Sequence, residues 1–104
     1  MPLTRSFKET LYARTKRDAA FRVALLAEGV GLLVAGDLSL GKSLLRDYIN
    51  ATLGFEALAD AVNIPVKSLM RMFGPSGNPQ ANNLFAVLSY LQEAEGVALK
   101  VRAA

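Results

Sequence analysis

The sequence predicts an all-α protein, a bundle of five to six helices with one short β-strand at its C-terminal end. Apolar residues recur every three or four positions along most of the 104-residue chain, which is the periodicity of a helix. Glycine, proline, asparagine and aspartate, which end helices or build turns, gather between these stretches. The length and the 52% hydrophobic content suffice for one domain with a single core.

Three helices are predicted in the first half of the chain, at residues 6–17, 19–34 and 39–52. Gly29 and Gly31 lie inside the second helix, where each costs about 1 kcal/mol relative to alanine. The third helix has apolar residues at the spacing of a buried face, namely Leu40, Leu44, Leu45, Tyr48, Ile49 and Leu53. The single domain 1–104 is accordingly divided into N-terminal helices (1–35), a central core (36–95) and a terminal strand or tail (96–104).

A last helix and a strand are predicted after the turn-rich loop 74–79. Asn82 or Asn83 is expected to cap this helix, and Gly96 to follow its end at Glu95. Its buried face is expected to consist of Leu84, Phe85, Val87, Leu88 and Leu91. Residues 97–102 then alternate between apolar and polar side chains, which is typical of a half-buried strand. Because no other segment of the chain is predicted to be a strand, it invites pairing with a second copy or another protein.

Two short helical segments, 55–62 and 66–73, make the most informative part of the sequence. Asn63 lies between them and tolerates the left-handed conformation of a tight turn, while Pro65 fits at or near the first position of the second helix. Five apolar residues can face inward together, namely Leu58, Val62, Ile64, Leu69 and Met72. This spacing predicts a helix-turn-helix, which places its second helix in a DNA major groove.

The outward positions of this arrangement are the candidate DNA-binding residues. On the second helix they are Val66, Lys67, Ser68, Met70 and Arg71. Lys67 and Arg71 are four residues apart, so they share a helical face and can donate to guanine or to phosphate. In and after the loop, the residues expected to fix phosphates are Ser76, Asn78, Gln80 and Asn83. Since one helix reads few base pairs, a homodimer on double-stranded operator DNA is expected.

Charge and composition exclude several other classes of function. The net charge is +3, but residues 1–22 hold six basic and only two acidic side chains, so this segment could follow phosphates or meet an acidic partner. With no cysteine and no histidine, disulfides, zinc sites and histidine-based catalysis are ruled out, and no enzyme, metal or cofactor is expected. Apolar runs are too short for a membrane span, and a cytoplasmic protein is expected.

Two alternatives stay open. Residues 36–43 match the phosphate-binding pattern G-x-x-x-x-G-K-S, in which Lys42 would reach the β- and γ-phosphates and Ser43 would bind Mg²⁺. A phosphate loop also needs a parallel sheet, whereas the residues after Ser43 are nearly all helical by pattern, which favours Lys42 on an exposed helical face. The other alternative is a helical module that binds only proteins.

The sequence also resembles a known family. The run GFEALADAVNIPVKSLMRMFGPSGNP (54–79), followed by NLFAVL (83–88), resembles the lambda-repressor-like antidote proteins of toxin–antitoxin addiction modules and related prophage-type regulators. The similarity covers residues 36–102, with a Gly-Asn-Pro loop at 77–79. This resemblance implies binding to an operator as a dimer and repression of the protein's own operon. It also implies a RelE/ParE-like toxin as a possible partner.

Overall fold

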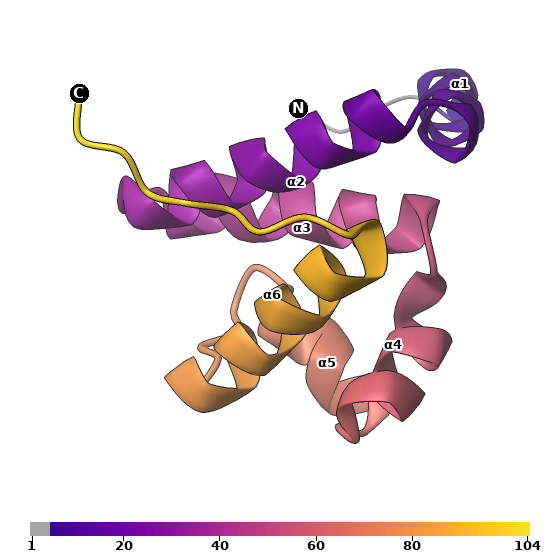
Figure 1. Ribbon diagram of the computed structural model, residues 1–104. Helices are drawn as coiled ribbons and strands as arrows, with labels where there is room; N and C mark the ends of the chain where they lie inside the picture. The colour runs from indigo at the N-terminus through magenta and orange to yellow at the C-terminus, as the bar shows by residue number, and fades with distance from the viewer. Residues whose placement is uncertain (1–4) are drawn as a thin grey trace.

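All regular secondary structure in residues 5–104, the part of the chain that the computed structural model describes, is α-helical (Figure 1). Side chains are described from Phe7 onward. The helices are α1 (Arg5–Arg17), α2 (Ala19–Val34), α3 (Leu38–Ala51), α4 (Gly54–Val62), α5 (Val66–Met72) and α6 (Ala81–Glu95). The predicted all-α class is confirmed, and most helix ends lie within one or two residues of their predicted positions.

Helices α2 and α3 form an antiparallel pair that packs closely at two glycines (Figure 1). A Cβ atom on Gly29 would lie 2.8 Å from Leu45 Cδ2, and one on Gly41 would lie 2.7 Å from Leu33 Cδ2. Both distances are shorter than side-chain carbons tolerate, so the glycines allow the two helices to approach. This contact accounts for Gly29 inside α2, whereas Gly31 faces open space.

The turn between α4 and α5 has the predicted backbone conformation. Asn63 is left-handed at φ 57° and ψ 46°, and Ile64 N–H donates to Ala59 O over 3.2 Å. Ala59 is buried, and a small side chain there lets the adjoining helices come together. Pro65 precedes α5 as its N-cap residue rather than occupying the first helical position. Its ring still favours this site, because a proline has no N–H to leave unsatisfied.

The C-terminal prediction is partly wrong. Helix α6 begins at Ala81 after Gln80, so neither Asn82 nor Asn83 is its cap, and it ends as predicted at left-handed Gly96 (φ 71°). Residues 97–102 form no strand, because the described chain offers no second strand with which to pair. The tail instead lies along the helices, where Val97 and Leu99 N–H donate to Gln92 O and Oε1 over 3.0 and 2.8 Å (Figure 1).

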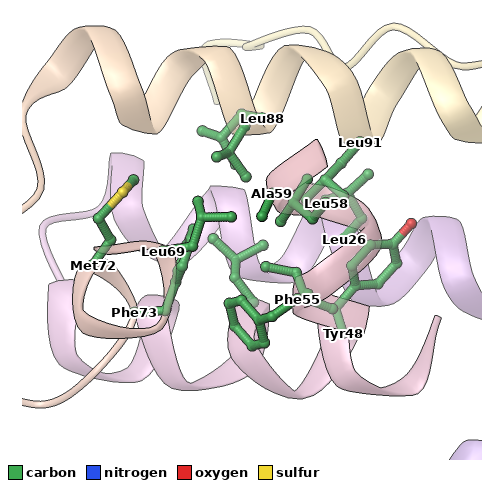
Figure 2. Close-up of a cluster of buried hydrophobic side chains, with 13 residues drawn as sticks. Leu26, Tyr48, Phe55, Leu58, Ala59, Leu69, Met72, Phe73, Leu88 and Leu91 are labelled. Atoms are coloured by element: carbon green, nitrogen blue, oxygen red, sulfur yellow. The ribbon is translucent and has the colours of Figure 1, made fainter. Parts of the chain in front are cut away.

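One hydrophobic core joins helices α2 to α6 (Figure 2). Leu58 and Leu69 are completely buried at its centre, and the rings of Phe55 and Phe73 lie 6.2 Å apart. Leu40 and Phe85, predicted to be buried, are instead 52% and 63% exposed. Both lie near the start of a helix, where correct spacing for a buried face does not ensure that a neighbouring helix covers it.

Candidate nucleic-acid interface

Helix α5 has one buried face and one exposed face. Leu69 and Met72 point into the core beside Phe73 (Figure 2). On the opposite side Lys67, Ser68, Met70 and Arg71 are all exposed, while Val66 is half-buried. The exposed fraction of Met70 is 53%, which is high for a large apolar side chain. The structure therefore brings the predicted base-contacting residues together on one short helix.

Lys67 and Arg71 are the charged groups of this face. Their positions four residues apart place them on neighbouring turns of α5. Among residues 7–104, whose side chains the structure describes, neither has a carboxylate within ion-pair distance, in contrast to Arg14 with Asp18 and Arg22 with Glu95. Two cationic side chains without a protein carboxylate are suited to an anionic partner such as phosphate, or to the acceptor atoms of guanine.

The loop 74–79 folds back onto the C-terminal end of α5. Gly74 N–H donates to Arg71 O over 3.1 Å, and Gly77 N–H donates to Gly74 O over 3.1 Å. A Cβ atom on Gly77 would overlap Arg71 O, so only glycine allows this approach. The flanking residues Ser76 and Asn78 are exposed, as is Gln80, whereas Asn83 on α6 is half-buried. The predicted phosphate-binding residues 76 and 78 thus adjoin the end of α5.

Lys42 is the residue of this region whose position sequence reasoning missed. Its side chain, predicted to lie on an exposed face of the third helix, is only 8% exposed. The ammonium Nζ donates to Gly74 O over 3.0 Å and to Gly77 O over 2.7 Å. Long amphipathic side chains bury their methylene groups and seek partners for their charged end, and Lys42 finds both acceptors in the loop after α5.

The geometry around Lys42 does not fit a phosphate-binding loop. Residues 30–34, which would have to form a strand before that loop, belong to α2. Gly41, Lys42 and Ser43 lie inside α3, where the backbone N–H groups are engaged in the helix rather than cradling an anion. The Lys42 ammonium is already bound to two carbonyl oxygens. Lys42 therefore has a structural partner in place of the β- and γ-phosphates.

Two further features lie away from α5. Arg22, Tyr48 and Glu95 form a polar cluster. Burial is the main cause that raises the pKa of Tyr48 well above its ordinary value of 10.0, and the hydrogen bond to Glu95 is the second.

The other feature is an apolar groove of about 600 Å³ between α2, α6 and the C-terminal tail. Its lining includes Val30, Val34, Phe85, Leu88, Leu99 and Val101.

No known family model matches the chain, and no curated protein or solved structure is significantly similar to it. None of the helices in residues 5–104 has both the length and the apolarity needed to cross a bilayer. The same residues contain no group of three or more acidic side chains placed to hold a metal ion.

Proposed function

We propose that this protein is a sequence-specific DNA-binding transcriptional regulator, in which α4 and α5 act as a lambda-repressor-like helix-turn-helix. The observation that carries the proposal is the division of α5 into a buried apolar face and an exposed face with two cations, Lys67 and Arg71, that have no ion-pair partner among residues 7–104. A helix of seven residues is about 10 Å long, so it fits across a major groove about 12 Å wide.

The proposed contacts follow from the chemistry of each side chain. Arg71 and Lys67 would donate to guanine O6 and N7, and Ser68 would make a shorter-range hydrogen bond to a base edge. Val66 and Met70 would contact thymine methyl groups. Main-chain and side-chain groups around Ser76 and Asn78 would fix the phosphate backbone, with Gln80 and Asn83 as further polar contacts. The basic residues of α1 would add non-specific attraction if DNA passes near them.

Selection of binding sites from a random duplex library tests this proposal. The selected sequence and a scrambled duplex are then titrated at two salt concentrations. Affinity should fall steeply with salt on both duplexes, because phosphate contacts release counterions, while the selected sequence keeps an advantage. Failure to bind either duplex at low salt would favour the alternative, a helical module that binds only proteins.

A homodimer is part of the proposal, because a single α5 helix reads too few base pairs for operator selectivity. Two copies would present their α5 helices about 34 Å apart and read an inverted repeat. The apolar groove and the tail 97–102 are the surfaces we assign to this contact, since Phe85, Val34 and Val101 are all exposed there.

An antidote role extends the proposal to a second partner. Its support is the resemblance of residues 36–102 to antidote proteins of addiction modules. If the role is correct, co-expression should relieve growth arrest caused by a RelE/ParE-like toxin encoded beside this protein. The surface of α5 should not be needed for that relief, so Arg71→Ala should still neutralise the toxin while failing to repress.

A further inference from the structure

We propose that Lys42 is a positioning residue of the DNA-binding site, which holds the loop 74–79 in place at the end of α5. This inference rests on the proposed function, because it concerns the same DNA-binding surface. It assigns a role to Lys42, whose side chain extends from the G-x-x-x-x-G-K-S pattern and donates to the loop after α5.

The two acceptors of Lys42 lie at both ends of one tight turn. Gly74 O is 3.0 Å and Gly77 O is 2.7 Å from Nζ, and Gly77 N–H closes the turn by donating to Gly74 O over 3.1 Å. A single ammonium therefore binds both ends of the turn, and Ser76 is exposed between them. The two acceptors are 32 and 35 residues away from Lys42 in the sequence. The contact therefore fixes the position of the loop relative to α3, whereas the hydrogen bond within the turn fixes only the shape of the loop.

The charge of Lys42 makes this contact strong and its loss costly. An ammonium donating to carbonyl oxygens forms charge-assisted hydrogen bonds, which are roughly twice as strong as neutral ones. A lysine buried to 8% exposure with uncharged partners is unusual, since buried cations are ordinarily paired with carboxylates. Removing Nζ would leave two carbonyl oxygens without this donor and would free the loop to move.

The position of the loop is coupled to Arg71 through the main chain. Gly77 packs directly on Arg71 O, with no room for a side chain, and Gly74 N–H donates to the same oxygen. A displaced loop would consequently disturb both the end of α5 and the residues Ser76 and Asn78. A buried residue that never touches DNA would in this way set the geometry of the groups that do.

The experiment compares Lys42→Met with Arg46→Met, which removes one positive charge from a half-buried position one turn further along α3, outside the proposed DNA and dimer surfaces. Affinity for the selected duplex is measured at a temperature at which both variants are folded. Amide hydrogen exchange is followed over residues 74–80 under the same conditions. We expect Lys42→Met to bind about tenfold more weakly, with faster exchange in the loop, and Arg46→Met to change affinity much less.

Gly77→Ala provides a second test that leaves Lys42 intact. The added methyl group must move the loop off Arg71 O, so this variant should also weaken binding and loosen the loop. If Lys42→Met fails to fold, Gly77→Ala decides whether the position of the loop controls DNA binding, and unchanged affinity in this variant would then overturn the proposal. The proposal is overturned if a folded Lys42→Met binds as well as wild type, if Arg46→Met loses as much affinity, or if hydrogen exchange in the loop is the same in Lys42→Met as in wild type. Wild-type protein that binds no DNA would instead reject the proposed function, a result distinct from these.

Discussion

Arg22 and Glu95, which are 73 positions apart in the sequence, form an ion pair in which Arg22 Nε lies 2.9 Å from Glu95 Oε1. Arg22 Nη1 also donates to Thr15 O over 2.9 Å, and Tyr48 Oη donates to Glu95 Oε1 over 2.7 Å. These contacts connect the end of α1, the start of α2, the last turn of α3 and the end of α6. The pair therefore holds these helices together at the end of α6, whereas the loop 74–79 lies before the start of that helix.

Glu95→Gln should destabilise the protein by about 2 to 3 kcal/mol, because it leaves the Arg22 guanidinium without its anion. The cost is below that of a fully buried pair, since the side chains of Arg22 and Glu95 are 25% and 9% exposed. Urea unfolding at pH 7 measures the change. Glu93→Gln is the matched control, because Glu93 is exposed on the same helix. Equal losses in the two variants would show that the ion pair adds nothing.

Tyr48 should make the protein sensitive to alkaline pH. Burial and the hydrogen bond to Glu95 raise its pKa above the ordinary 10.0, so the folded protein keeps a proton that the unfolded chain releases. The stability from this group is complete below pH 10 and is lost as the pH rises toward the raised pKa. Tyr48→Phe should reduce the fall in unfolding free energy between pH 9 and pH 11. An identical fall in both proteins would contradict this assignment.

The local parts of the fold could be predicted because their causes lie within a few residues. Asn63 at the turn, Gly96 after α6 and the buried positions Leu58 and Leu69 all follow from propensity and helical period. The position of Lys42 could not be predicted in this way, since its acceptors are 32 and 35 residues away. The helical pattern predicted an exposed Lys42, and the alternative motif predicted phosphate as its partner, whereas its partners are two carbonyl oxygens of a protein loop.

The C-terminal tail shows that a local pattern can also predict an element that does not form. Alternation in residues 97–102 indicated a strand, yet alternation requires only that one side of an extended segment is apolar. Leu99 is half-buried against the helices and Val101 is 82% exposed, so the pattern describes a tail resting on a groove. Whether such a segment becomes a strand depends on a partner edge, which is not a property of its own sequence.

The two glycines inside α2 should respond to alanine in opposite directions. Gly31→Ala should stabilise the protein by up to about 1 kcal/mol, because the methyl group enters open space and improves helix propensity. Gly29→Ala should destabilise it, since the methyl group would lie 2.8 Å from Cδ2 of the fully buried Leu45. The free-energy cost of overpacking, about 1 to 3 kcal/mol, exceeds the gain in stability from the better helix propensity of alanine. Thermal unfolding of the two variants measures both signs, and stabilisation by Gly29→Ala would refute the close helix contact.

Arg71→Ala tests whether α5 reads bases. If Arg71 makes a bidentate contact with guanine, the variant should lose about 1 to 3 kcal/mol on the selected duplex and much less on scrambled DNA. Lys67→Ala is the companion variant on the same exposed face. Titration of each variant on both duplexes gives the discrimination directly. An equal loss on the two duplexes would make Arg71 a phosphate contact instead.

The assignment of the dimer surface can be tested at Val101, whose side chain is 82% exposed and therefore contributes little to the fold of one copy. Val101→Asp places a charge at the edge of the apolar groove, where burial in a dimer would be costly. Ala103→Asp adds the same charge two residues further along the exposed tail. Sedimentation at tens of micromolar should give a dimer for wild type and Ala103→Asp, and a monomer for Val101→Asp. A chain truncated after Gly96 should likewise be monomeric, because it lacks the tail. A dimer in every variant would move the interface away from the tail, and a wild-type monomer would reject the dimer itself.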